Sequence, residues 1–402
     1  MLRVNATPPK YDVIVCGSGS AGFSAAIAAA RCGASVAIVE KYNTPGGILT
    51  VLGNNSIDQF NNPFRNDKKM IIEGIGWEFV LRLYRDGFAR IPDMNALYRE
   101  HSQYGVKVNP VAAAKVMDDM LSEAGVKLFY GQPVVDVVTE HRSVKSVMIA
   151  TKDGLLELEA KIFIDCTGDG DVAHLAGAVT CSGDSNGVFQ PGTIRYYPAV
   201  DFQNDDKILN FGDNRNHVKI DVTNSDAITD AEIISRRMLY SEMQKGKPIM
   251  AAAPAVAARE GRRIKGLSTM TQEDYMEGKQ YPDSVCYTFW FIDIHREGKA
   301  AEIQYFKSEN TPSIRLSAMI SYDFDNLMMA GRCISTDRQT NSAIRVKASC
   351  MAMGQAAGSA AALSALDNTL PKLLQIDKVK QTLEDQGAIV PGKCEGKDFL
   401  LP

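Results

Sequence analysis

Short apolar runs and a longer alanine-rich stretch alternate near the start of the chain. Residues 11–16 and 35–39 are apolar and short enough to be buried strands. Residues 20–32 between them are rich in alanine and end at Gly33, as a helix commonly does. The order strand, helix, strand predicts a βαβ unit, in which both strands run parallel in one sheet.

The next segments predict a capped helix followed by a small β-meander. Asn109 and Pro110 provide an N-cap and a first-turn proline for a helix that ends near Gly125. Asp153 and Gly154 then form a hairpin turn between two apolar strand patterns. Strands are predicted at residues 127–130, 134–139, 144–150, 155–158 and 161–166, and the last of them ends in the turn residues 167–171.

The pattern becomes irregular between residues 182 and 322, with a polar region at 201–226. One helix is clear there, from Thr229 to Gly246, with Thr229 and Glu232 as its capping box. Residues 324–332 then predict a strand that enters a glycine turn, and residues 346–366 predict a long helix of small residues. The two ends of the chain therefore read as α/β and the middle as α+β.

Length and charge narrow the class of protein. A chain of 402 residues predicts two or three domains, at ~100 to 200 residues each. Lys and Arg number 44 against 48 Asp and Glu, and no basic block occurs, which disfavours nucleic acid as a partner. Residues 348–366 are nearly uncharged, but their alanine, glycine, serine and glutamine content favours a buried helix over a membrane span.

The cysteines exclude several kinds of site. No two of the 8 cysteines have Cys-x-x-Cys spacing, so we expect no metal site, iron–sulfur cluster or redox dithiol. Several lie in apolar runs, where a reduced thiol acts as a small hydrophobe. Reduced thiols and the lack of a signal peptide lead us to expect a cytoplasmic protein. The sequence gives no indication of oligomeric state.

A glycine-rich turn lies directly between the first predicted strand and the first predicted helix. In Gly17-Ser18-Gly19-Ser20-Ala21-Gly22 the first glycine permits the tight turn, the second lets a pyrophosphate approach the backbone, and the third lets helix and strand pack closely. The phosphate then meets the N-terminus of the helix. Glu40 ends the second strand, where its carboxylate can accept the hydroxyls of an adenosine ribose. The context favours dinucleotide binding over a purely structural turn.

Three later segments separate a flavin from a nicotinamide cofactor. Residues 41–47 contain the doublet Gly46-Gly47, residues 162–171 contain Thr167-Gly168-Asp169, and residues 326–335 with 349–358 contain Gly331, Arg332, Gly354 and Gly358. Together they resemble the bacterial FAD-dependent oxidoreductase family of the glutathione-reductase-like superfamily, which is related to the succinate dehydrogenase and fumarate reductase flavoproteins. The segment 335–339 lacks the histidines expected beside the flavin, and 312–315 fits the family pattern only loosely, so the resemblance does not specify a substrate.

The resemblance implies the fold, the domains and the cofactor residues. The implied fold class is α/β, with a Rossmann-like FAD-binding domain, a β-meander and an inserted α+β substrate domain. Residues 1–181 and 323–402 would form the FAD-binding domain with a cap at 53–108, and residues 182–322 the insertion. A helix starting at Gly354 would direct its N–H groups toward the flavin, although a small-residue packing face explains the same glycines. The implied FAD-binding residues are Gly17, Ser18, Gly19, Ser20, Ala21, Gly22, Glu40, Lys41, Gly46, Gly47, Ile48, Val135, Thr167, Gly168, Asp169, Gly331, Arg332, Gly354 and Ala357.

Candidate catalytic groups come from the middle of the chain. Arg259, Arg262 and Arg263 cluster in sequence, and an arginine fork suits a carboxylate, although the cluster could equally be a solvated patch. His295 ends an apolar run and is a candidate proton donor or acceptor, while a lone histidine is more often structural. Arg345 lies between the two C-terminal cofactor segments and could face either substrate or flavin.

The expected activity is hydride transfer between flavin N5 and a small, carboxylate-bearing substrate. No second Gly-x-Gly-x-x-Gly follows a strand, which disfavours a dedicated NAD(P) domain. Three alternatives stay open: a flavoprotein with a non-oxidative or RNA-modifying role, a catalytically inert binding protein such as the GDP-dissociation inhibitors of this fold, and a plain NAD enzyme. The lack of basic character disfavours the RNA-modifying role, and the intact glycine triplet disfavours the inert binding protein. The later flavin segments disfavour the NAD enzyme.

Overall fold

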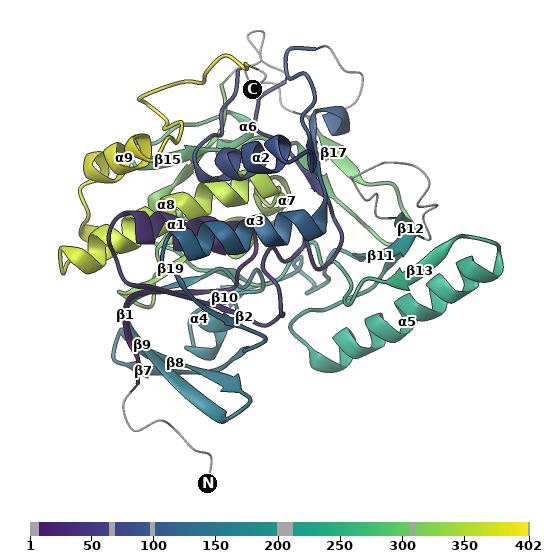
Figure 1. The fold of residues 1–402 in the computed structure, drawn as a ribbon, viewed down its shortest axis with the longest axis horizontal. Helices are drawn as coiled ribbons and strands as arrows, with labels where there is room; N and C mark the ends of the chain where they lie inside the picture. Colours follow the sequence, from purple (N-terminus) through teal and green to yellow (C-terminus); the bar gives the residue numbers. More distant parts are fainter. Residues whose placement is uncertain (1–7, 64–68, 97–100, 199–211, 306–309, 401–402) are drawn as a thin grey trace.

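A seven-stranded sheet joins the N-terminal and C-terminal parts of the chain in the computed structural model (Figure 1). The structure describes residues 8–63, 69–96, 101–198, 212–305 and 310–400. Parallel pairs join β6 to β2, β2 to β1, β1 to β9 and β9 to β19, and antiparallel hairpins add β8 and β7. These strands are β1 (Lys10–Cys16), β2 (Val36–Glu40), β6 (Lys127–Tyr130), β7 (Val134–Glu140), β8 (Ser143–Thr151), β9 (Gly154–Asp165) and β19 (Leu327–Met329). The predicted βαβ unit is confirmed. The predicted meander is confirmed for β7, β8 and β9 but not for its first strand, β6, which pairs in parallel with β2 at the other edge of the sheet.

Strand β9 corrects the prediction of two separate strands at 155–158 and 161–166. Its first half pairs with β8 in antiparallel fashion, and its second half pairs with β1 in parallel. Glu159 and Lys161, which looked like a break, lie where the strand passes from one neighbour to the other. They form ion pairs with Lys10 at 2.8 Å and Asp12 at 2.9 Å. Charged residues are compatible with the strand because they lie at its exposed stretch.

Helices α1 (Ser20–Arg31) and α8 (Lys347–Leu366) pack against each other over the sheet (Figure 1). Both are buried along almost their whole length. A Cβ on Gly354 would collide with the carbonyl oxygen of Ala21, and a Cβ on Gly358 with that of Ala25. The two backbones therefore touch, which explains the small residues of the predicted helix at 346–366. Around this pair pack α2 (Ile75–Arg85), α3 (Pro110–Glu123) and α9 (Ile376–Asp385).

Helix caps test the local predictions. Asn109 caps α3 as predicted, since its Oδ1 accepts from the backbone N–H groups of Val111 at 2.9 Å and Ala112 at 3.1 Å. The predicted capping box of Thr229 and Glu232 is wrong, because α5 (Ser225–Gln244) begins earlier, with Asn224 as its N-cap.

The two residues of that predicted box have other partners. Thr229 lies inside α5 and donates its hydroxyl to the carbonyl of Ser225 at 3.0 Å. Glu232 accepts a hydrogen bond from the backbone N–H of Val256 at 2.6 Å. A serine–threonine–asparagine-rich approach to a helix offers several competing caps, so its first turn is hard to place from sequence.

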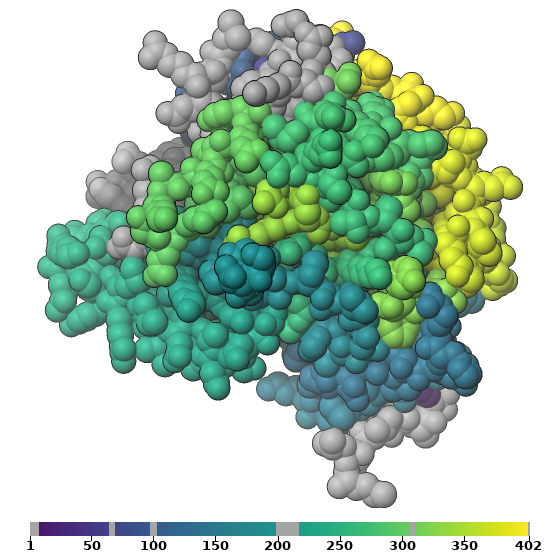
Figure 2. All heavy atoms as spheres, turned by 180° about the vertical axis from the view of Figure 1, so that it is seen from behind, coloured from purple at the N-terminus to yellow at the C-terminus, as the bar shows by residue number. Residues whose placement is uncertain are grey.

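The middle of the chain divides its apolar residues between two cores. A three-stranded sheet and α5 enclose a separate small core that includes Ile194, Val218, Ala231 and Leu239. This unit projects at one side of the molecule (Figures 1 and 2). Apolar residues between 264 and 320, such as Ile314, instead join the main core. The domain boundaries stay a prediction. Residues 201–211 of the predicted polar region lie outside the described residues.

The remaining elements are short. Those of the middle region are β10 (Thr180–Cys181), β11 (Gly192–Pro198), β12 (Gly212–Val218), β13 (Ile249–Ala252), β14 (Arg263–Ile264), α6 (Gln272–Met276), β15 (Ser284–Tyr287), β16 (Ile292–Ile294), β17 (Glu302–Gln304) and β18 (Ser313–Arg315). The others are β3 (Ser56–Ile57), β4 (Ala89–Arg90), β5 (Val106–Val108), α4 (Asp171–Leu175) and α7 (Arg338–Ile344). The strand predicted at 324–332 is thus limited to β19. None of the described helices is long and apolar enough to cross a membrane.

The contact between α1 and α8 gives a direct test of the fold. Gly358→Ala should destabilise the protein by about 3 kcal/mol or more, because the added methyl group overlaps backbone that cannot rotate away. Chemical denaturation of the cofactor-free protein measures this loss. Gly19→Ala is the matched control, since a Cβ there meets no protein atom within 4 Å. Equal stability of the two variants would show that the helices do not pack this closely.

Candidate functional site

The carboxyl ends of the parallel strands bring the predicted cofactor segments to one edge of the sheet. Cys16 at the end of β1 is in register with Val39 in β2 and with Asp165 in β9, and Asp165 is in register with Met329 in β19. The Gly17 turn, Glu40, Thr167 and Gly331 follow these residues. Ligands of open α/β sheets bind outside this edge, so the register alone groups the segments into one candidate site.

The glycine-rich turn contains two glycines that the fold requires and one that it does not. Gly17 has a φ of +97°, and a Cβ there would collide with the carbonyl of Cys166. A Cβ on Gly22 would collide with the carbonyl of Gly17, so the helix start lies directly on the turn. A Cβ on Gly19 would meet no protein atom within 4 Å. The protein's own packing therefore does not require a glycine at 19, whereas a pyrophosphate against the turn would.

The N-terminus of α1 has the donors that a phosphate needs. No side chain caps this helix, and its first turn contains no acidic residue. Ser20 Oγ is buried and has no hydrogen-bond partner among the described residues. Free N–H groups and the positive end of the helix dipole form an anion site, and an orphaned hydroxyl adds one more donor. This donor set fits a cofactor phosphate.

Glu40 has a role in the turn itself. Its buried carboxylate accepts from Ser18 N at 2.7 Å, Ser18 Oγ at 3.0 Å and Tyr42 N at 2.9 Å. Since a carboxylate can accept about four hydrogen bonds, roughly one position is left for a ligand hydroxyl. The structure thus shows Glu40 holding the phosphate-binding turn, and its contact with a ribose stays a prediction.

The glycine doublet lies against this turn. Gly46 N donates to Ser18 O at 2.8 Å, and a Cβ on Gly47 would lie 3.3 Å from the Cα of Gly19. Ile48 follows and is partly buried. The first predicted segment after Glu40 is therefore placed beside the phosphate-binding turn.

Lys41 faces the second cofactor segment. Burial lowers the pKa of Lys41, but electrostatic interactions with Asp169, Tyr42, Asp171 and Glu40 outweigh it and raise the pKa overall. The ammonium group of Lys41 therefore links the segment 41–47 electrostatically to Asp169 and Asp171 of the second segment.

The second segment is organised by a buried carboxylate. Asp165 accepts from Thr167 N at 3.0 Å, Thr167 Oγ1 at 2.7 Å and Ala173 N at 3.0 Å. Burial raises the pKa of Asp165 to about 6, although these hydrogen bonds oppose the shift. Gly168, with a φ of +82°, then turns the chain toward α4. Asp165 fixes the shape of the threonine-glycine turn.

The C-terminal segment is joined to the second one by an ion pair. Arg332 Nη2 lies 2.9 Å from Asp169 Oδ1, and Arg332 Nη1 donates to the carbonyl of Ala258. A Cβ on Gly331 would lie 3.2 Å from the Cβ of Ala21 in the Gly17–Gly22 turn. The C-terminal segment therefore contacts both the second segment and the Gly17–Gly22 turn directly.

The remaining predicted cofactor residues lie on α8 and β7. The expected helix start at Gly354 is wrong, because α8 begins at Lys347, so Gly354 and the fully buried Ala357 lie in its interior. The alternative explanation, a packing face of small residues, accounts for Gly354. Val135 lies on β7 of the meander with 42% of its side chain exposed.

Three of the candidate catalytic residues, Arg259, His295 and Arg345, meet around Asp293. His295 Nε2 lies 2.9 Å from Asp293 Oδ1, and Arg345 Nη2 lies 3.3 Å from Asp293 Oδ2. Arg345 Nη1 also donates to the backbone carbonyl of Arg259 at 3.1 Å. Burial works to raise the pKa of Asp293, but His295, Arg345 and Arg259 outweigh it and hold the pKa below its usual value. Asp293 therefore stays ionised and orients its neighbours.

His217 completes this group, which we call the Asp293 cluster (Arg259, Asp293, His295, Arg345 and His217). Arg259 Nη2 lies 3.3 Å from His217 Nε2, and the rings of His217 and His295 contact edge to face at 5.2 Å. Sequence analysis missed His217, because a histidine in a polar region carries no periodic signal. It also assigned no role to Asp293. A signal for Asp293 was present, because residues two apart on a strand face the same side, and a carboxylate at 293 therefore lies beside the candidate His295.

Arg262 and Arg263 are not part of this cluster. Arg262 Nη1 lies 3.0 Å from Asp171 Oδ1 and donates to the carbonyl of Asp169, so it supports the second cofactor segment. Arg263 Nη2 donates to the carbonyl of Gly183 at 3.2 Å. Neighbours in the sequence thus point to three different places.

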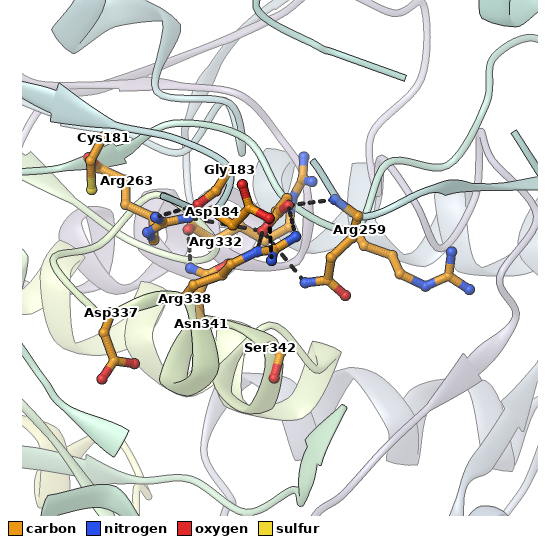
Figure 3. A network of polar contacts seen from close by, with 12 residues as sticks. Cys181, Gly183, Asp184, Arg259, Arg263, Arg332, Asp337, Arg338, Asn341 and Ser342 are labelled. Atoms are coloured by element: carbon orange, nitrogen blue, oxygen red, sulfur yellow. Dashed lines mark hydrogen bonds and ion pairs between the residues drawn. The ribbon is translucent and has the colours of Figure 1, made fainter. Parts of the chain in front are cut away.

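A buried ion network lies beside the cluster (Figure 3). Arg338 reaches from α7 and pairs with the buried Glu260, at 2.9 Å from Nη2 to Oε1 and 3.0 Å from Nε to Oε2. Glu260 also accepts from the backbone N–H of Gln190, whose side-chain carbonyl accepts from His295 N at 3.0 Å. Every charge in this network has a partner, so it supports the cluster structurally and holds β16 in place.

Solved structures of flavoproteins and related proteins resemble this fold at low identity. A geranylgeranyl bacteriochlorophyll reductase-like protein from Thermoplasma acidophilum is 14% identical over 95% of this chain and 83% of its own, with a TM-score of 0.42. The L-proline dehydrogenase from P. horikoshii is 13% identical over 95% of this chain and 99% of its own, with a TM-score of 0.43. Similarity at this level says nothing about the substrate.

A curated relative and a family model match the sequence itself. An NADH:fumarate oxidoreductase from Klebsiella pneumoniae (strain 342) is 60% identical over 43 residues, which span 11% of this chain and only 5% of that protein. The model of the FAD dependent oxidoreductase family matches residues 12–240 and 213–383, which is most of the chain. The chain therefore belongs to the FAD dependent oxidoreductase family, and its cofactor is FAD.

Proposed function

We propose that this protein transfers a hydride between a small carboxylate-bearing substrate and flavin N5, with the Asp293 cluster as its substrate site. The observation that carries the proposal is the pairing of His295 with an ionised Asp293, next to two arginines. A histidine oriented by a carboxylate is suited to proton transfer, and arginine is suited to a carboxylate. The short match to NADH:fumarate oxidoreductase supports the narrower relation to fumarate reductase flavoproteins.

We assign the FAD to the edge of the sheet where the segments converge. The N-terminus of α1 with Ser18, Gly19 and Ser20 would hold the pyrophosphate, and Glu40 the ribose. Bound FAD supplies a two-electron acceptor or donor at its isoalloxazine ring. We also keep the proposal that residues 1–181 and 323–402 form the FAD-binding domain, with a cap at 53–108 and a substrate domain at 182–322.

The residues of the Asp293 cluster have separate tasks in this proposal. Oxidation removes a hydride from a substrate carbon and a proton from a neighbouring atom, and His295 would accept the proton at Nδ1, which is bonded to none of the described residues. Arg259 would bind the substrate carboxylate. Arg345 is a positioning residue, because Asp293, Ser342 O and Arg259 O occupy its donors. The same groups serve the reverse reaction.

The glycine turn provides a test of cofactor placement. Gly19→Val should abolish FAD binding, because a branched side chain would fill the space that the pyrophosphate needs, while a Cβ at this position meets no protein atom within 4 Å. Flavin absorbance per chain after reconstitution measures binding, and circular dichroism checks the fold. Gly19→Ala should weaken FAD binding less than Gly19→Val does. A Gly19→Val variant that retains wild-type affinity for FAD would show that the turn is only structural.

The substrate site is tested by titrating small mono- and dicarboxylates while the flavin spectrum is followed. Arg259→Ala should weaken binding tenfold or more, since a charge-assisted hydrogen bond contributes ~1.5 to 3 kcal/mol. His295→Ala should slow flavin reduction more than it weakens binding. Arg296→Ala is the matched control, because Arg296 is next to His295 but pairs with Glu302 on the exposed surface.

Two outcomes would contradict this assignment. If no carboxylate perturbs the wild-type flavin, the substrate class is wrong. If Arg259→Ala and His295→Ala both behave like Arg296→Ala, the Asp293 cluster is not the substrate site. FAD content should be equal in all three variants, since the cluster lies outside the cofactor segments.

A further inference from the structure

A buried lysine at the start of α8 has no role in the function proposed above. Lys347 is only 6% exposed, and its Nζ donates to the backbone carbonyl of Ser56 at 2.5 Å. The next residue, Ala348, donates its backbone N–H to the carbonyl of Asp58 at 3.1 Å. The lysine is thereby held between α8 and the small β3–β5 sheet.

More positive than negative charge surrounds this ammonium group. Lys107 lies on β5 directly opposite Ser56, and Arg195 approaches from β11. Asp58 is the carboxylate that interacts with Lys347, while Cys350 lies on the same helix. Among the described residues neither Lys347 nor Lys107 forms an ion pair.

A buried ammonium group without a paired carboxylate is costly, because it loses water and gains no equivalent partner. Burial lowers the pKa of Lys347 to about 8; Asp58 and Cys350 oppose this shift, whereas Arg195 and Lys107 add to it. A ligand anion would remove the cost. The charges come from three different parts of the chain, so tertiary folding brings them together.

The position is close to the cofactor segments. Cys350 lies one turn along α8 from Lys347, about 5 Å along the helix axis. A Cβ on Gly331 would lie 4.0 Å from Cys350 Sγ. Gly331 in turn contacts Ala21 of the phosphate-binding turn. A ligand held by Lys347 would therefore lie next to the assigned FAD site.

We propose that Lys347 and Lys107 form a binding position for an anionic group of the substrate, where α8, the β3–β5 sheet and β11 meet. The identity of the ligand as the substrate rests on the proposed function. The binding of an anion does not. Lys347 anchors the charge, and Lys107 adds to the field without being buried itself.

Thermal unfolding of the FAD-loaded protein tests the proposal, with inorganic phosphate and small carboxylates as probes against chloride at equal ionic strength. Each probe should raise the unfolding temperature of the wild type, since a ligand that binds only the folded state stabilises it. Lys347→Met should weaken this response at least tenfold in probe concentration. Without a probe, Lys347→Met should be as stable as the wild type or more so, because methionine has a similar shape and removes a buried charge that has no carboxylate at ion-pair distance.

The pH dependence follows from the depressed pKa. Since the folded protein releases the Lys347 proton more readily than the unfolded chain, stability without a probe should rise with pH between about 8 and 10.5. The effect of the probe should be complete below pH 8 and fade above it. Lys347→Met should lack both features, and Lys152→Met, at an exposed hairpin turn, should retain them.

Two further variants keep the test decisive if Lys347→Met does not fold. Lys107→Met should weaken the response to the probes, and Lys347→Arg should retain it. Responses in Lys347→Met or Lys107→Met that equal the wild-type response would overturn the proposal. If phosphate binding depends on Lys347 but no carboxylate perturbs the flavin, the anion position stands and the proposed substrate class fails. If carboxylates perturb the flavin equally in wild type and Lys347→Met, the proposed function stands and the anion position fails.

Discussion

Direct backbone contact between α1 and α8 determines where everything else at the site lies. Gly354 and Gly358 have no side chain, so α8 rests on the carbonyls of Ala21 and Ala25. Since α1 begins at the phosphate-binding turn, the contact brings the first turn of α8 to the same edge of the sheet. The C-terminal segment reaches the N-terminal one in this way, across most of the length of the chain.

Local structural features could be predicted from the sequence, whereas contacts between distant segments could not. The turn Gly17–Gly22 and the cap Asn109 are visible because each needs a particular residue at a fixed offset from its own element. The capping box at Thr229 failed because Asn224 offers a competing cap upstream. The expected helix start at Gly354 failed because a glycine required by packing looks like one required by a helix terminus.

The candidate catalytic residues show the same limit. Arg259, Arg262 and Arg263 are neighbours in sequence but have different partners, since each lies on an irregular segment whose direction only the surrounding fold determines. His217 and Asp293 join Arg259 through tertiary contacts alone. Charge pairing then separates the groups: Glu260 and Arg338 form an ion pair, whereas Lys347 is buried with no carboxylate of the described residues at ion-pair distance.

We propose that one FAD binds where the phosphate-binding turn and the three later cofactor segments converge. The most direct measurement is chromatographic identification and quantification of the cofactor that heat releases from the purified, reconstituted protein. We expect FAD at about one molecule per chain, in accord with the single phosphate-binding turn seen in the sequence. Release of FMN or a nicotinamide nucleotide, or no cofactor after incubation with FAD, would contradict it.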